Sequence, residues 1–290
     1  MRPPPESFKF SCDVGLSGEF QRRVQDYYGA NVLASRECIC EHHRQCHESA
    51  RPNHFAAAQL SFVGDRYAIE LDSRPWRIAI VSMQTGEVES PITMSRRREQ
   101  FSQRVTEDFM QRNAHIKGVT SALRVLYGND AGRDNAGELI VTATGAVHVL
   151  NAHALINATL CSSIKKPGSR EGQGSDVMHH SCVAHLTNVL KLLKPTIVHS
   201  QGRRADKKTA TPHRSLLEVF DSGSIRWHDE HVATATLEGR PIAWVSTGHP
   251  SAKGNSAWQN PESKKFSESV GPALRRGHEI ALGLHDQYWT

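Results

Sequence analysis

Three short polar segments of this sequence each follow an apolar run and carry side chains that can do chemistry. They are residues 82–87, residues 157–161 and residues 247–251. The first offers an amide and a carboxylate, the second an amide and a thiol, and the third an imidazole. An imidazole or a carboxylate can act as acid, base or hydrogen-bond donor, and an amide pairs with both donors and acceptors. We therefore expect these segments to form the functional site.

The elements that must position these segments can be predicted from hydrophobic periodicity. Buried strands are predicted at residues 77–81, 155–156, 196–198 and 242–246, and helices at residues 95–112, 114–127 and 176–193. Asp176 can cap the last helix and Pro195 ends it. Residues 139–150 are compatible with either strand or helix. The alternation is typical of an α/β fold with a parallel or mixed sheet between helices, where ligands bind at strand ends.

Composition limits the class of protein. The chain has 290 residues and a formal charge of +5, so it can bury a large core and carries only a mild basic excess. Because no apolar run approaches the length of a membrane span and no signal-peptide core is visible, we expect a cytoplasmic protein with no membrane partner. In that compartment, six cysteines are expected to be reduced thiols or metal ligands.

The three segments resemble, in order and spacing, the signature loops of the uracil-DNA glycosylase superfamily, most closely its iron–sulphur (family 4-like) branch. That branch has a Gly-Glu-Ala-Pro-Gly-type loop, a Thr-Asn strand end with two cysteines beyond it, and a late Thr-Tyr-His-Pro-Ser loop. The matching residues are Ser82-Met83-Gln84-Thr85-Gly86, Ile156-Asn157 with Leu160-Cys161 and Cys182, and Thr247-Gly248-His249-Pro250-Ser251. The resemblance covers roughly residues 76 to 275. It implies a three-layer αβα fold with a central, mostly parallel sheet.

The resemblance also implies roles for individual residues. His249 would donate a hydrogen bond to the departing base, and Asn157 and Gly86 would bind that base after it leaves the duplex. Phe101 is the candidate ring to stack on it. The first loop departs from the family, since Met83 stands where the iron–sulphur branch has Glu. Water activation is therefore assigned to Gln84 or Glu87.

Two cysteines in register with the family imply a metal site. Cys161 and Cys182 would be joined by Cys46 and Cys40 as the four ligands of a [4Fe–4S] cluster. Cys38 and His43 are alternative ligands, and a zinc site of thiolates is equally consistent with these residues. On this interpretation, residues 1–57 form an N-terminal extension that contributes metal ligands to a glycosylase-like α/β domain of residues 58–290.

DNA is the partner that the resemblance implies. Ser251, Lys253, Lys165 and Lys166 are the candidate DNA-binding residues, and other basic stretches, among them residues 96–98, lie near the three segments in sequence. We expect a monomeric, monofunctional DNA glycosylase that excises a damaged or modified pyrimidine by water attack. The alternatives are a lesion-binding protein with the same fold that does not cut, and a zinc-stabilised hydrolase.

Overall fold

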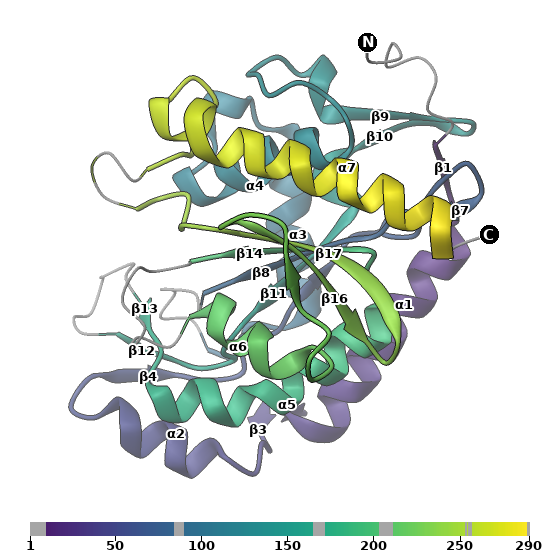
Figure 1. Ribbon diagram of the computed structural model, residues 1–290. Coiled ribbons are helices and arrows are strands. Elements are labelled where there is room, and N and C mark those ends of the chain that lie inside the picture. Colours follow the sequence, from purple (N-terminus) through teal and green to yellow (C-terminus); the bar gives the residue numbers. More distant parts are fainter. Residues whose placement is uncertain are drawn as a thin grey trace.

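The computed structural model describes residues 10–83, 90–164, 172–202, 211–252, 254 and 257–288, and its fold is mixed α/β (Figure 1). Within these residues the largest sheet has seven strands. In spatial order they are β15 (Arg226–Trp227), β16 (Val232–Leu237), β17 (Arg240–Thr247), β14 (Ile197–Gln201), β8 (Ile78–Ser82), β11 (His153–Asn157) and β5 (Phe62–Val63). The four neighbours β17, β14, β8 and β11 are parallel, and β15, β16 and β5 are antiparallel to their partners.

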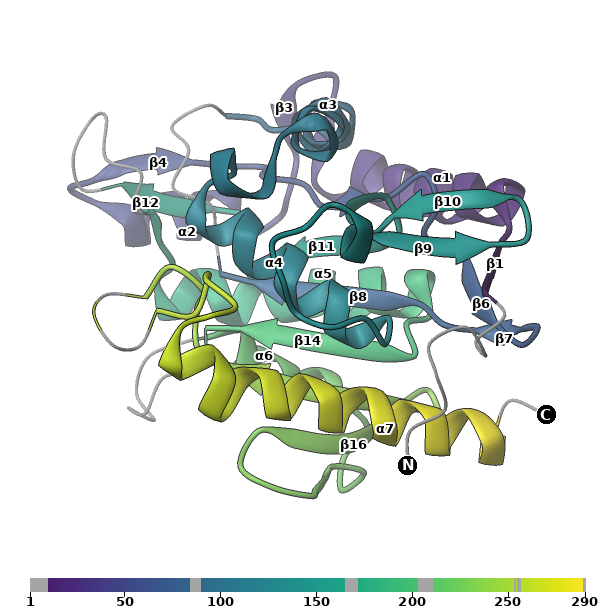
Figure 2. The same cartoon turned by 90° about the horizontal axis from the view of Figure 1, so that it is seen from above.

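Helices pack against this sheet through two hydrophobic clusters. Ile78 and Ile80 of β8 enter one cluster, with residues of α4 (Ala114–Leu126) and α7 (Gly271–Tyr288). The alternate residues Ala79 and Val81 enter the other cluster, whose helical members lie mainly on α1 (Val14–Asn31), α5 (Asp176–Leu193) and α6 (Pro212–Val219). Because successive strand side chains point to opposite faces, β8 is buried on both, which explains its continuous apolar run. Figure 2 shows β14, β8 and β11 side by side with α4 over them.

Smaller elements surround the main sheet. A five-stranded sheet contains β10 (Gly145–His148), β9 (Leu139–Thr142), β1 (Phe10–Cys12), β6 (Ile69–Leu71) and β7 (Arg74–Pro75). A three-stranded sheet contains β13 (Gly172–Gln173), β12 (Ser162–Ile164) and β4 (His54–Ala56), and β2 (Leu33–Ala34) pairs with β3 (Glu37–Cys38). The remaining helices are α2 (His43–Ala50), α3 (Met94–Thr106), the 3₁₀ turns η2 (Phe109–Gln111), η3 (Ala136–Glu138) and η4 (Val149–Asn151), and the π-helix η6 (Phe266–Val270).

The predicted strands and helices are present, with corrected ends. The helix expected over residues 95–112 ends at Thr106, and the guanidinium of Arg112 donates to the carbonyls of Arg104 and of Glu107, the residue after the helix. Ser175, rather than Asp176, caps α5 by accepting a hydrogen bond from the backbone of Met178. The undecided residues 139–150 contain the hairpin β9–β10.

The described helices include none with the length and apolar character needed to cross a membrane.

Candidate functional site

The carboxyl ends of the four parallel strands lie in one row across the sheet. Asn157 of β11 is the register partner of Ser82 of β8, and Gln201 of β14 is the partner of Thr247 of β17. Ser82 Oγ donates a hydrogen bond to Gln201 Oε1 at 3.2 Å, which joins the two pairs. By alternation, all four side chains point to the face that α4 and α7 cover. The polar ends of strands far apart in sequence therefore converge at one edge.

His249 lies two residues after Thr247, in the loop that follows β17. Its Nδ1 lies 2.9 Å from Ser251 Oγ and accepts a hydrogen bond from the backbone N–H of Ser251 at 3.3 Å. Because a backbone amide can only donate, Nδ1 is the acceptor and the proton of the neutral ring is on Nε2. The ring is half-buried. His249 is thus arranged to donate a single hydrogen bond through Nε2.

Sequence reasoning missed the residue that links His249 to the strand row. His115 is the second residue of α4, and its ring is stacked on that of His249, with centroids 5.3 Å apart and an interplanar angle of 16°. Its Nε2 lies 3.1 Å from both Ser82 Oγ and Gln201 Oε1. The helix over residues 114–127 was predicted, but His115 was not among the candidate site residues. The signal available in the sequence was His115 itself, a polar residue in the first turn of a predicted helix and three residues before Gly118.

Asn157 lies at this edge of the sheet, and the nitrogen of its side-chain amide is hydrogen-bonded. The residue is 7% exposed, and Nδ2 donates to the backbone oxygen of Gln59 at 3.2 Å. Among the described residues, no donor is assigned to its Oδ1. The bond to Gln59 therefore holds the plane of the amide.

Two residues expected near a ligand lie inside the protein instead. Phe101 of α3 is 3% exposed and stacks on Phe62, with ring centroids 4.1 Å apart, so its ring belongs to the core and is not presented at the sheet edge. Arg97 is also buried, and its Nε donates to the backbone oxygen of Leu60. Helical periodicity places both on the inner face of α3, which explains why their residue types were misleading.

Several expected site residues lie outside the described residues. They are Gln84, Gly86 and Glu87 of the first loop, and the candidate DNA-binding residues Lys165, Lys166 and Lys253. Ser251 is described and exposed, and its observed contact is with His249.

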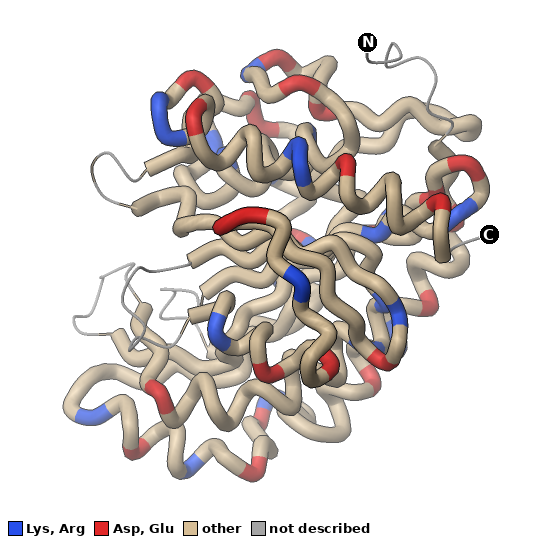
Figure 3. Tube along the Cα trace, viewed as in Figure 1, with Lys and Arg blue, Asp and Glu red and all other residues tan. Residues whose placement is uncertain are grey.

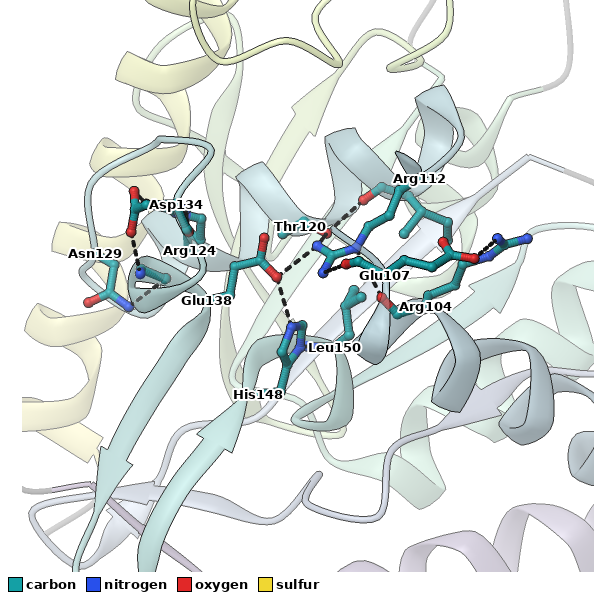
Figure 4. A network of polar contacts seen from close by, with 12 residues as sticks. Arg104, Glu107, Arg112, Thr120, Arg124, Asn129, Asp134, Glu138, His148 and Leu150 are labelled. Atoms are coloured by element: carbon teal, nitrogen blue, oxygen red, sulfur yellow. Dashed lines mark hydrogen bonds and ion pairs between the residues drawn. The ribbon is translucent and has the colours of Figure 1, made fainter. Parts of the chain in front are cut away.

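A buried polar network holds the beginning of α4, and with it His115. Arg112, one residue before the cap of this helix, forms an ion pair of 2.7 Å with Glu138, and both side chains are 1% exposed (Figure 4). His148 Nε2 is 2.7 Å from the same carboxylate oxygen. Burial raises the pKa of Glu138, but the contacts with His148 and Arg112 outweigh it and hold that pKa below its ordinary value. Asn113 caps α4 by accepting from the backbone of Ile116.

The cysteines expected to bind metal lie on α5 or near it. Cys46 of α2 and Cys161, which follows β11, are hydrogen-bonded thiols, and Cys38 packs in the same cluster. The contact between the two thiols lowers the pKa of Cys46 and raises that of Cys161. Burial raises the pKa of Cys182 to about 12, and the nearby Cys46 and Cys40 add to this effect.

Cys40, one of the four expected ligands, and His43, an alternative ligand, contact different residues. Cys40 Sγ lies 3.4 Å from Nε2 of His185, and Tyr27 OH lies 2.8 Å from the Nδ1 of that ring. His43 instead packs against Phe55 and stacks on His47. The thiols have the chemistry of an iron–sulphur or zinc site. In the described residues, however, no group of three or more Cys, His, Asp or Glu side chains is arranged to hold a metal ion.

Comparisons with known proteins add no further evidence about the site. No protein-family model matches the sequence, and no match is found among curated proteins.

Proposed function

We propose that this protein is a monofunctional DNA glycosylase that extrudes a damaged or modified pyrimidine and hydrolyses its bond to the sugar. The observation that carries the proposal is the hydrogen bond from the backbone N–H of Ser251 to Nδ1 of His249, which puts the proton of the neutral ring on Nε2, in the loop that follows β17. We also propose that the sheet and its two helical clusters form a three-layer αβα fold of the uracil-DNA glycosylase type. The order β11-β8-β14-β17 of the parallel strands supports this.

The chemistry assigned to His249 is stabilisation of a leaving anion. When the glycosidic bond breaks, the sugar gains positive charge and the base oxygen gains negative charge. A donor that is already oriented stabilises that oxygen without reorganising, and losing such a donor typically costs about 3 kcal/mol of transition-state stabilisation. No lysine occurs in residues 82–87, 157–161 or 247–251 to form a Schiff base, so water is assigned as the nucleophile.

Asn157 is assigned to recognition of the extruded base. Its amide is held by Gln59 on one side, so a pyrimidine with a donor on its pairing edge can bind Oδ1. The residue that activates water is proposed to be Gln84 or Glu87, on sequence grounds alone. A protein with the same fold that binds lesions without cutting remains the alternative function.

DNA is the proposed partner, with the protein acting as a monomer. Along the described trace, Figure 3 shows basic and acidic positions interspersed. The candidate phosphate contacts are therefore those of the sequence, namely Lys165, Lys166, Lys253 and Ser251. Phosphate contacts by such residues would make affinity fall as salt rises.

A metal site is part of the proposal, with a [4Fe–4S] cluster favoured over zinc. Cys40, Cys46, Cys161 and Cys182 would hold it; Cys46 of α2 and Cys161, just before β12, share one cluster, and Cys182 of α5 lies near Cys46 and Cys40. The group would tie these three segments together. Iron, sulphide and zinc analysis of anaerobically purified protein, with a visible absorption spectrum, tests this. Protein that binds neither metal would contradict it.

A substrate panel tests the enzyme proposal. Single- and double-stranded oligonucleotides carrying uracil, hypoxanthine or modified cytosines are incubated with the protein and then treated with alkali, which cleaves abasic sites. We expect abasic product from at least one substrate and its loss in His249→Ala. His228→Ala, which changes an exposed histidine after β15, is the matched control and should retain activity. Binding without abasic product from any substrate would favour the alternative.

A further inference from the structure

His115 is the point at which three strand ends meet. Its Nε2 contacts Ser82 at the end of β8 and Gln201 at the end of β14, each at 3.1 Å, while its ring lies against His249 beyond β17. The contact brings His249 back over the central strands, although β17 is separated from β8 by β14.

The protonation of His115 follows from its partners. The carbonyl Oε1 of Gln201 can only accept, so Nε2 of His115 donates and Nδ1 carries no proton. Burial lowers the pKa of His115 to about 3, with His249 and Arg97 lowering it further and the bond to Gln201 opposing them. At neutral pH, an uncharged ring therefore lies against His249.

The position of this ring is set by contacts on α4 rather than by His249. Arg112, the residue before the helix cap, forms an ion pair with Glu138. It also donates a hydrogen bond to Thr120, which follows His115 on α4. The beginning of the helix therefore cannot shift without breaking a buried ion pair. The ring of His115 is a fixed surface against which the half-buried ring of His249 rests.

We propose that His115 is a positioning residue that sets the ring plane and the tautomer of His249. The stacked ring covers one face of His249 and prevents it from rotating away from Ser251, so Nδ1 remains the acceptor and Nε2 the donor. His115 acts through His249 and touches no substrate. Its effect on base release rests on the proposed function, whereas its effect on the ring of His249 is a property of the free protein.

Two variants separate the ring of His115 from its hydrogen bonds. His115→Gln retains a donor toward Gln201 but removes the stacked ring, and His115→Phe retains a ring but loses the bonds to Ser82 and Gln201. We expect His115→Gln to lower kcat by about tenfold to a hundredfold, as small losses of orientation do, with KM little changed. His115→Phe should retain more kcat than His115→Gln but unfold at lower denaturant, because Gln201 Oε1 loses a donor.

The decisive measurement is the ¹⁵N spectrum of the histidine rings in full-length protein without DNA. The signals of His249 are assigned by their absence in His249→Ala. In the wild type we expect one unprotonated acceptor nitrogen and one protonated nitrogen, and in His115→Gln we expect averaged shifts that report mixed tautomers. His228→Gln is the matched control and should leave the His249 signals unchanged.

The outcomes of the two readouts are distinguishable. Folded His115→Gln with the wild-type signals of His249 would overturn the positioning role, whatever the activity. Wild-type protein that releases no base but shows the expected change of His249 signals would retain the positioning role and remove the proposed function.

Discussion

Gly118 of α4 and Pro250 of the loop after β17 approach so closely that no side chain fits between them. A Cβ atom on Gly118 would lie 2.3 Å from Cβ of Pro250 and 2.6 Å from its Cγ. Such separations do not occur between real carbon atoms, and the proline ring cannot bend aside as a long side chain can. The helix that carries His115 and the loop that carries His249 are thus in direct contact at two successive turns.

Gly118→Ala should therefore displace the His249 loop while the fold is retained. We expect base release to fall by about tenfold to a hundredfold, since reacting groups would be misplaced by a fraction of an ångström or more. Glycine to alanine elsewhere in an exposed helix is stabilising. Gly29→Ala on α1, where an added Cβ meets nothing within 4 Å, is the control and should not lower activity. Full activity in Gly118→Ala would show that the contact is unimportant.

Removing the carboxylate charge of Glu138 should destabilise the protein strongly. In Glu138→Gln, Arg112 would remain buried without its ion-pair partner, and such losses typically cost about 3–5 kcal/mol of unfolding free energy. Urea unfolding at neutral pH measures this. Glu262→Gln, which removes the charge from the more exposed pair with Arg133, is the control and should cost about 0–1 kcal/mol. Equal effects of the two substitutions would contradict the importance of burial.

The pH dependence of Glu138 has a definite sign. Its pKa is lower when folded than its ordinary value of 4.5, so its contribution to stability is complete above that value and is lost as the pH falls below it. The difference in unfolding free energy between wild type and Glu138→Gln should shrink as the pH is lowered below 4.5. A difference that stays constant down to pH 3 would show that Glu138 does not titrate in this way.

Buried neutral histidines should make the protein sensitive to acid at higher pH than the carboxylates do. Burial lowers the pKa of both His153 and His199 to about 3, from an ordinary value of 6.5. Between these values the unfolded chain binds the proton and the folded chain does not, so stability rises with pH by about 1.4 kcal/mol per unit for each group. His199→Gln, which can keep the bond to Thr247, should reduce that slope in unfolding measured from pH 6.5 to 4. An unchanged slope would count against a neutral His199.

Ser251→Ala should weaken the orientation of His249 without removing it. The substitution deletes the hydroxyl 2.9 Å from Nδ1 but keeps the backbone N–H at 3.3 Å. We expect base release from bound DNA to fall, but by less than in His249→Ala. Normal base release from bound DNA would show that Ser251 acts as a DNA contact only and does not orient His249.

Local features of the sequence were sufficient to predict the central strands and the long helices. The runs at residues 77–81 and 242–246 are apolar because parallel strands are buried on both faces, and α5 is recognisable from its helical period and the proline that follows. The order of the three polar segments was also visible, since each follows a buried strand. These features depend only on residues that are close to one another in the sequence.

The partners of His249 depended on contacts between residues far apart in the chain. His115 was recognised only as part of a helix. No neighbouring residue in the sequence indicates that the first turn of α4 lies against a loop more than a hundred residues later. Phe101 was misassigned for the same reason, because its ring stacks on Phe62 of an antiparallel strand. By itself, the sequence determined which strands carry polar ends. Only tertiary packing decided which side chains those ends meet, because close approaches such as that of Gly118 to Pro250 arise from the whole core.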